Sequence, residues 1–342
     1  MDYSSEHIDE EFDREFSRIY EEQTEAINAQ LDQDILFALI GDVNTGKSST
    51  INQLMGADVA KVGASPGATS AIDLYTFKQH ITFADTPGLD DIIQDHSKET
   101  LGYYENADVI LFFLNAAGTV FSEGEKSIFE KIAAVNQDII IVLNKIDAAE
   151  DIDSLKAYVK NHTGGTFPIV AISSKNGTNI DQLRHAILDI LEKKQKDIQL
   201  AKELEGKKAK ASVAGKWILG ASVAAAGVGA TPIPGADIIP ITSIQVGLMV
   251  KLASLYDQPM TKKQAKKLVV TTLVGNFGQT MYRQVTKFFP GAAFIAGTTI
   301  AGAVTAAFGY SIKYAFEHGI DLSTENLGGM IEEYLGQWQK RD

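Results

Sequence analysis

The ten residues from Gly41 to Thr50 read GDVNTGKSST, and they decide what the first half of the chain can be. Four of them fit the pattern G-x-x-x-x-G-K-[ST]: Gly41, Gly46, Lys47 and Ser48. In this pattern the glycines let main-chain N–H groups turn toward a phosphate, the lysine reaches the outer phosphate oxygens, and the serine hydroxyl can ligate Mg²⁺. The stretch therefore predicts a phosphate-binding loop, which also contains Thr45 and Ser49.

The surroundings of this loop fit an α/β domain. An apolar run, DILFALIG at 34–41, leads into the loop, and a helical pattern follows from Ser48. Short apolar runs alternate with helical patterns up to about residue 195, which is typical of βα units around a mainly parallel sheet. Six strands are expected, at 34–41, 72–78, 80–85, 107–115, 138–144 and 167–173. Only one residue separates the second from the third, so we expect that pair to be antiparallel.

A short acidic motif ends the third expected strand. It reads DTPG, from Asp85 to Gly88. Asp85 would hold Mg²⁺ through water, and the main-chain N–H of Gly88 could sense a γ-phosphate. Taken alone, D-x-x-G is expected by chance and is usually an ordinary turn.

A second polar motif, NKID from Asn144 to Asp147, ends the fifth expected strand. The Asp147 carboxylate can accept hydrogen bonds from N1 and N2 of guanine, a pattern that adenine does not offer. Asn144 would brace the neighbouring loops and approach the base, while the stem of Lys145 would cover its face. Taken alone, NKID is better explained by a strand-end turn. The sixth strand ends in three further candidates, whose main chain could reach the guanine O6: Ser173, Ser174 and Lys175.

Taken together, these motifs resemble the translation-factor-like class of small GTPases, in particular the Era-like group. The loop, a threonine, D-x-x-G, N-K-x-D and S-S-K occur in order over about 34–195, each at the expected strand end. The resemblance implies a GTPase domain with GTP or GDP as ligand, Mg²⁺ as cofactor, and hydrolysis of GTP to GDP and phosphate. It also implies that Thr69, within SPGATS, is the first-switch threonine that ligates Mg²⁺.

One departure from the common small-GTPase pattern follows D-x-x-G. Many small GTPases have a water-positioning glutamine there, but this chain has Leu89, which cannot orient water by hydrogen bonding. Asn44 could compensate for the missing glutamine. In potassium-activated relatives, the asparagine at this position resembles a K⁺ ligand, and carbonyls of the first switch complete the site. The corresponding carbonyls of this chain would lie within 63–67. Alternatively, Asn44 stabilises the loop, as asparagine does in turns. Both explanations stay open, and the missing glutamine favours K⁺. The residues expected to act at the γ-phosphate are Asn44, Lys47, Thr69 and Gly88.

Composition narrows the class of protein. The chain has 342 residues, a formal net charge of −13 and no cysteine. The negative charge disfavours a broad nucleic-acid surface, and the absence of cysteine excludes disulfides and thiolate metal sites. The acidic N-terminal sequence lacks the features of a signal peptide, so we expect a cytoplasmic protein, or one peripheral at the inner face of a membrane.

Two further segments flank the expected GTPase domain at 34–195. Residues 1–33 predict an amphipathic helix whose apolar positions are Ile8, Phe12, Phe16, Ile19, Ile27 and Leu31. A Lys-rich connector at 193–216 leads into sequence rich in Ala, Gly, Ile and Val. We therefore expect an all-α helical domain at 196–342, with the helix of residues 1–33 docked on it.

Two runs in the C-terminal half are poor in charge. Residues 217–250 contain one charge, Asp237, and residues 288–312 contain none over 25 residues, long enough for a membrane span of about 20 residues. The second run is rich in small residues, and Pro290-Gly291 interrupts its start. Small residues at every fourth position suit close helix packing in lipid or in a protein core: Ala293, Gly297, Ala301, Thr305 and Gly309. A soluble bundle is favoured over a span.

The C-terminal half also carries a resemblance. The stretch 231–257 and the later small-residue run resemble a domain of unassigned function that is fused to Era-like GTPase domains in bacteria. Helices at both chain ends resemble the arrangement in immunity-related and dynamin-like GTPases. The likeness is architectural, so the hypothesis for function depends on the charge-poor runs and the small-residue stripe. These features favour a GTP-driven switch or mechanoenzyme whose helical domain contacts a membrane surface or a second copy of the chain. Two alternatives stay open: a ribosome or RNA assembly GTPase, although no nucleic-acid module is recognisable, and a GTP-dependent switch that binds a soluble protein.

Overall fold

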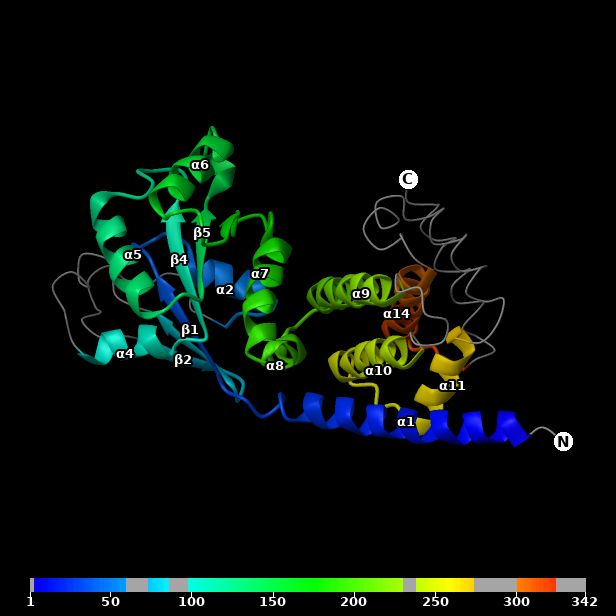
Figure 1. Cartoon of the computed structure of the whole chain (residues 1–342). Helices are drawn as coiled ribbons and strands as arrows, with labels where there is room; N and C mark the ends of the chain where they lie inside the picture. The colour runs from blue at the N-terminus through cyan, green and yellow to red at the C-terminus, as the bar shows by residue number, and fades with distance from the viewer. Residues whose placement is uncertain (1–2, 60–72, 86–97, 230–237, 274–299, 324–342) are drawn as a thin grey trace. The chain divides into compact units, whose positions relative to one another are not determined.

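The computed structural model describes residues 3–59, 73–85, 98–229, 238–273 and 300–323 (Figure 1). The chain divides into two compact units. Residues 30–209 form one unit, and residues 1–29 together with 210–342 form the other.

A six-stranded sheet lies at the centre of the 30–209 unit, in the order β2-β3-β1-β4-β5-β6. Its strands are β1 (Ile35–Ile40), β2 (Asp73–Phe77), β3 (Ile81–Asp85), β4 (Val109–Asn115), β5 (Ile139–Asn144) and β6 (Ile169–Ala171). β2 pairs with β3 antiparallel, and every other pair is parallel. The mainly parallel sheet with one antiparallel pair confirms the fold class predicted from the sequence.

Helices cover both faces of this sheet, with α4 and α5 on one side and α2 and α7 on the other (Figure 1). The helices of the unit are α2 (Lys47–Met55), α4 (Lys98–Asn106), α5 (Glu123–Val135), α6 (Ile152–His162), α7 (Ile180–Lys193) and α8 (Asp197–Glu203), with a 3₁₀ turn η1 (Ile146–Ala148). The ring of Phe112 in β4 meets that of Phe129 in α5 edge-on, with centroids 5.4 Å apart. β4 is apolar at six consecutive buried positions because it is covered on both faces.

The parallel strands end at one edge of the sheet, and the register brings the motif residues to that edge. Leu39 of β1 is paired with Asp85 of β3, and Asn115 of β4 with Asn144 of β5. In an open parallel sheet, ligands bind at the carboxyl ends of the strands. The motifs predicted to bind the phosphates and the base therefore lie at the same edge of the sheet, at the carboxyl ends of the parallel strands.

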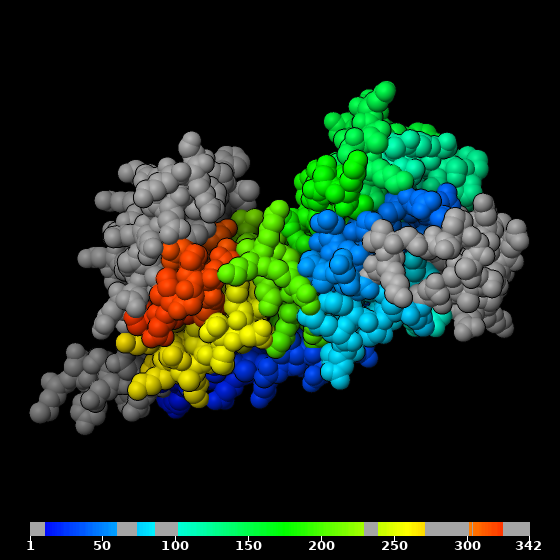
Figure 2. Space-filling view, turned by 180° about the vertical axis from the view of Figure 1, so that it is seen from behind, coloured from blue at the N-terminus to red at the C-terminus, as the bar shows by residue number. Residues whose placement is uncertain are grey.

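The second unit is helical. Its described helices are α1 (Tyr3–Asn28), α9 (Lys207–Gly229), α10 (Ile238–Leu255), α11 (Lys262–Leu273) and α14 (Ile300–His318), and α9 belongs to this unit from residue 210 onward. α1 lies along α10 and α11 (Figures 1 and 2). Its buried residues Phe16, Ile19 and Ile27 form the inward face of an amphipathic helix. Lys262 Nζ lies 2.9 Å from the Glu21 carboxylate and ties α11 to α1.

The small-residue stripe of the sequence falls partly on α14; Ala293 and Gly297 lie outside the described residues. A Cβ at Gly309 would lie 2.8 Å from Cγ1 of Ile218 in α9 and 2.9 Å from Cδ2 of Leu248 in α10. Thr305 is buried and accepts a hydrogen bond from Gln245 at 3.3 Å. The described part of the stripe thus allows three helices to pack closely within the protein.

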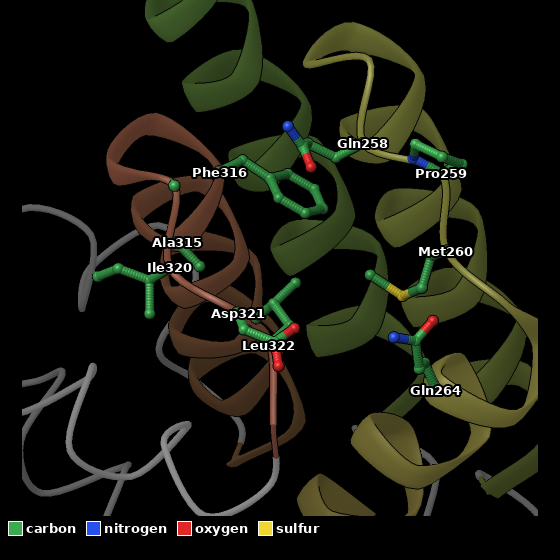
Figure 3. A pocket seen from close by; sticks show the side chains of 10 residues that line it. Gln258, Pro259, Met260, Gln264, Ala315, Phe316, Ile320, Asp321 and Leu322 are labelled. Atoms are coloured by element: carbon green, nitrogen blue, oxygen red, sulfur yellow. The ribbon is translucent and has the colours of Figure 1, made fainter.

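A pocket of about 310 Å³ lies beside the α10–α11 connection and the end of α14 (Figure 3). Phe316 and Met260 face it from opposite sides, and Asp321 contributes a carboxylate. None of its ten lining residues is a lysine or arginine, so the pocket lacks the positive charge expected of a phosphate site.

Candidate nucleotide site

The loop between β1 and α2 depends on two glycines because other chain segments approach it closely. A Cβ at Gly41 would lie 2.7 Å from the main-chain oxygen of Phe113. A Cβ at Gly46 would lie 2.2 Å from Nδ2 of Asn144, and Gly46 also has a φ of 92°. The loop is therefore held between the carboxyl ends of β4 and β5, where a phosphate group would meet the N-terminus of α2.

Lys47 is the first residue of α2, and its ammonium lies within this loop. Nζ donates to the carbonyl of Gly41 at 2.7 Å and lies 3.6 Å from the carboxylate of Asp85. The buried hydroxyl of Thr45 donates to the Asp42 carbonyl at 2.7 Å and closes the loop. One fixed positive charge and a helix N-terminus thus point to the same place, which suits a phosphate.

The oxygen donors beside Lys47 fit Mg²⁺. Ser48 and Ser49 are half-buried at the start of α2, and Asp85 ends the neighbouring strand β3. Among the described residues, no group of three or more His, Cys, Asp or Glu could hold a metal ion. One carboxylate and one hydroxyl, with the rest of the coordination from phosphate and water, are a usual set for Mg²⁺. Two other expected γ-phosphate residues, Thr69 and Gly88, lie outside the described residues.

The fully buried side chain of Asn144 joins three loops of the site. Its Nδ2 donates to the carbonyl of Thr45 at 2.7 Å and to the hydroxyl of Ser174 at 3.0 Å. Its Oδ1 accepts from the main-chain N–H of Ser174 at 3.0 Å. The phosphate-loop threonine and the S-S-K segment are therefore held at fixed positions relative to the end of β5.

The Asp147 carboxylate is oriented by the neighbouring S-S-K segment. The hydroxyl of Ser173 donates to Oδ1 at 2.6 Å, and the ammonium of Lys175 lies 3.8 Å from Oδ2. The Ser173 hydrogen bond is the largest cause that lowers the pKa of Asp147, and the charges of Lys175 and Lys145 act in the same direction. Asp147 is consequently an ionised acceptor at neutral pH, as recognition of two guanine N–H groups requires.

The loops that carry the base residues are also tied to each other. Lys145 has a φ of 66° and turns the chain from β5 into η1. The next N–H, of Ile146, donates to the carbonyl of Ile172 at 3.2 Å. Ser173 and Thr178 form an isolated antiparallel bridge that closes the following loop. These contacts hold Lys145 and Lys175 beside Asp147.

Asn44 is exposed at the outer side of the phosphate loop and has a φ of 63°. Asparagine is one of the few residues other than glycine that tolerate this backbone region. This conformation gives a reason for Asn44 that is independent of K⁺. Leu89 and the carbonyls of 63–67, which the K⁺ hypothesis also invokes, lie outside the described residues.

Sequence reasoning missed the residues that hold the far end of α2. Arg184 of α7 is buried, and its Nη2 donates to the carbonyl of Leu54 at 2.9 Å. The main-chain N–H of Glu205 donates to the carbonyl of Met55 at 2.8 Å. Both contacts satisfy last-turn carbonyls that a helix leaves without intrahelical partners. No local motif marks them, because the partners are main-chain atoms far away in the sequence.

Comparisons with known proteins agree with this geometry. Residues 36–145 match a family model described as "50S ribosome-binding GTPase", and residues 194–340 match "Domain of unknown function (DUF697)". The GTPase Era of Halothermothrix orenii is 33% identical over 165 residues, which are 45% of this chain and 54% of that protein. The tRNA modification GTPase MnmE of Thermotoga petrophila is 32% identical over 165 residues, 46% of this chain and 36% of that protein. The chain thus spans about half, or less, of the length of these curated relatives.

Proposed function

We propose that this chain, which has an Era-like GTPase domain and a C-terminal region matching a domain of unknown function, binds GTP with Mg²⁺ and hydrolyses it to GDP and phosphate. The observation that carries the proposal is the set of hydrogen bonds of Asn144, which tie Thr45 of the phosphate loop to Ser174. The preceding residue, Ser173, donates to the carboxylate of Asp147, which would read guanine. Lys47 would compensate the charge of the β- and γ-phosphates, and Ser48 and Asp85 would hold Mg²⁺. Thr69 and Gly88 would contact the γ-phosphate from their segments.

Base specificity tests this proposal. Asp147→Asn replaces one acceptor oxygen by an N–H₂ donor, so the guanine N2 group would lose its partner. Xanthine has an oxygen at that position and could accept from the new donor. We expect the unchanged chain to prefer GTP over ATP by at least about a hundredfold, and D147N to prefer XTP over GTP. Displacement of a fluorescent GDP measures both, and equal displacement by ATP and GTP would contradict the guanine site.

We also propose that K⁺ stimulates hydrolysis through Asn44, in support of which stand the exposed side-chain oxygen and the leucine at position 89. Asn44→Gly distinguishes K⁺ ligation from the alternative that Asn44 only stabilises the loop. Glycine still allows the positive φ of this position, but it lacks the side-chain oxygen that would bind K⁺. We expect faster phosphate release in KCl than in NaCl at equal ionic strength, and equal rates in the two salts for N44G. Equal rates in the unchanged chain would contradict a role for K⁺.

The helical unit is proposed to contact an anionic membrane surface through α9. Among the described residues, one helix is long and apolar enough to span a membrane, at 207–228, and 39% of its apolar window is buried. Leu219 and Val223 lie one turn apart and are 41% and 44% exposed. Lys207 and Lys208 are exposed at the start of α9. Part of this helix is visible in light green in Figure 2. Basic residues beside an apolar face favour a lipid surface with negative headgroups.

Flotation with liposomes tests this surface. The protein is mixed with neutral or phosphatidylserine-containing vesicles, without nucleotide, with GDP, or with a non-hydrolysable GTP analogue. We expect flotation with the anionic vesicles, most with the analogue, and its loss in the double variant L219S/V223S. Val135→Ser, at an equally exposed valine of the other unit, serves as control. If the protein stays at the bottom in every arm, α9 is not a lipid surface, and nucleotide-dependent self-association would be the remaining effector role to measure.

A ribosome or RNA assembly role is the second candidate, favoured by the description of the matched family as ribosome-binding. That match ends at residue 145 and covers the GTPase domain alone. Co-sedimentation with ribosomal subunits in the presence of the GTP analogue would support this candidate over membrane contact.

A further inference from the structure

A short segment between α7 and α9 contacts two elements that lead to the nucleotide site. We call residues 194–206 the coupling segment; it contains α8 and ends at Gly206, directly before α9 begins. Leu200 and Leu204 are buried, so the segment is a packed part of the 30–209 unit rather than a free linker.

The first end of the coupling segment is fixed to the edge of the sheet opposite the nucleotide site. Lys196 Nζ lies 2.8 Å from the Asp108 carboxylate, which precedes β4, and donates to the carbonyl of Asp34 at 2.7 Å. Lys194 Nζ lies 2.7 Å from the carboxylate of Asp138, which precedes β5. These contacts anchor the segment to strands that form the rigid centre of the domain.

The other end touches the helix that begins at the phosphate loop. The N–H of Glu205 donates to the carbonyl of Met55 at 2.8 Å, and a Cβ at Gly56 would lie 2.2 Å from the Glu205 oxygen. α2 runs from Lys47 to Met55, so about 13 Å of helix separates the phosphate lysine from this contact. A displacement of α2 would act directly on residues 204–206.

The same end also touches the β2–β3 hairpin. Lys78 lies in the hairpin turn; its ammonium is 3.2 Å from the Glu203 carboxylate and 3.7 Å from that of Glu205. It also donates to the carbonyl of Glu203 at 3.1 Å. In the chain, this hairpin connects residues 60–72, which contain Thr69, to residues 86–97, which contain Gly88. The turn is thus linked to both segments expected to respond to the γ-phosphate.

The two ion pairs of Lys78 differ in exposure, since the side chain of Glu203 is 18% exposed and that of Glu205 is 50% exposed. The Lys78–Glu205 pair is poorly suited to stabilise the fold, because Lys78 is itself 38% exposed and exposed pairs contribute about 0–1 kcal/mol. Such contacts can be exchanged at little cost, whereas the buried leucines keep α8 in place. We propose that the coupling segment transmits the nucleotide state of the site to the helical unit, and that Lys78 is the contact through which the hairpin moves it. The proposal rests on the proposed GTP binding.

Spin-label distance measurements test the coupling, and the absence of native cysteine makes labelling simple. Cysteines are introduced at exposed positions of the two units, Tyr158 in α6 and Lys263 in α11. Distance distributions are recorded with saturating GDP and with a non-hydrolysable GTP analogue. The comparison includes K78E, the charge-swapped triple variant K78E/E203K/E205K, and K126E as a control that breaks an ion pair of α5 with Glu123.

We expect two different distributions for the unchanged chain and for K126E, one common distribution for K78E, and recovery of the difference in the triple variant. Affinity for fluorescent GDP should stay within about threefold in all four proteins. A full nucleotide-dependent difference in K78E would overturn the coupling role, as would its absence in a chain that binds both nucleotides. Failure to bind nucleotide at all would instead refute the proposed function, and the coupling with it.

Discussion

Among single residues, Asn144 is the one whose buried amide connects the phosphate loop with the S-S-K segment. Asn144→Ala leaves the Thr45 carbonyl and the Ser174 N–H without this partner. The expected result is a loss of about 1–3 kcal/mol in the free energy of unfolding and at least tenfold weaker GDP binding. Urea unfolding and a fluorescent GDP titration measure the two effects.

Asn106→Ala is the matched control, because its amide makes an exposed contact with the Gly102 carbonyl in α4. It should change neither quantity. An N144A protein that binds GDP as tightly as the unchanged chain would show that the hydrogen bonds of Asn144 do not position the nucleotide.

The pKa of Asp147 gives a prediction for the effect of pH. Its carboxyl is held below the ordinary value near 3.9, so binding should be insensitive to this group from pH 8 down to about 4.5. A carboxyl group whose pKa is lowered in the folded protein stabilises the fold at every pH above its ordinary pKa. This stabilisation is lost as the pH falls through the pKa of the folded state, because the carboxylate is then protonated. Ser173→Ala removes the largest cause, so the acid-side loss of GDP affinity should begin at higher pH. GDP titrations at several pH values would contradict this if both proteins lost affinity at the same pH.

The sequence alone predicted which residues form the candidate nucleotide site and in which order they occur. It did not predict which distant residues contact them in the folded chain. The side chains of Lys47, Asp85, Asn144 and Asp147 gather at one edge because parallel strands place their carboxyl ends together. Arg184 could not be found in the same way. Its role depends on carbonyls of α2 that only the folded chain brings near, and a lone arginine in a helix carries no signal for that.

At the scale of elements, α2 is the part that connects chemistry to the rest of the domain, and its C-terminal glycine tests this. Gly56 has a φ of 75°, and an added Cβ would meet the main chain of Glu205. Gly56→Ala should lower the free energy of unfolding by about 2–4 kcal/mol, from backbone strain together with displacement of residues 204–206.

Gly164→Ala is the matched control for strain alone, because Gly164 has a φ of 69° and no atom within 4 Å of an added Cβ. It should cost about 1–2 kcal/mol. If urea unfolding gave the same loss for both variants, the contact of Glu205 with α2 would contribute nothing to stability.

The elements differ in how far sequence could define them. β2 and β3 were predictable as an antiparallel pair, since one intervening residue excludes a crossover. The two charge-poor runs differ: 217–250 overlaps α9, the one helix among the described residues that is long and apolar enough to span a membrane. Residues 288–299, which begin the second run, lie outside the described residues, so the prediction for that run stays untested. The lysines of α9 are at its start, and uniform Ala/Gly/Val sequence does not reveal which face is covered by neighbours.

At the scale of the whole molecule, the two units divide the proposed work. The 30–209 unit contains the site, and the other unit brings together both ends of the chain, with α1 packed on α10 and α11. The C-terminal region matches a family without an assigned function. Its proposed role is therefore based on the exposed residues of its own helices. The chain passes between the units twice, after residue 29 and after residue 209, and the proposed coupling uses the second connection, which leads into α9.

Release of inorganic phosphate tests whether the chain hydrolyses GTP in preference to ATP. The full chain is incubated with Mg²⁺ and either GTP or ATP, beside Lys47→Ala, which removes the ammonium of the phosphate loop. We expect faster phosphate release from GTP than from ATP, no release when Mg²⁺ is chelated, and a reduction of at least about a hundredfold in K47A. Release from GTP no faster than in K47A, or equal release from ATP, would rule out guanine-specific hydrolysis at this site.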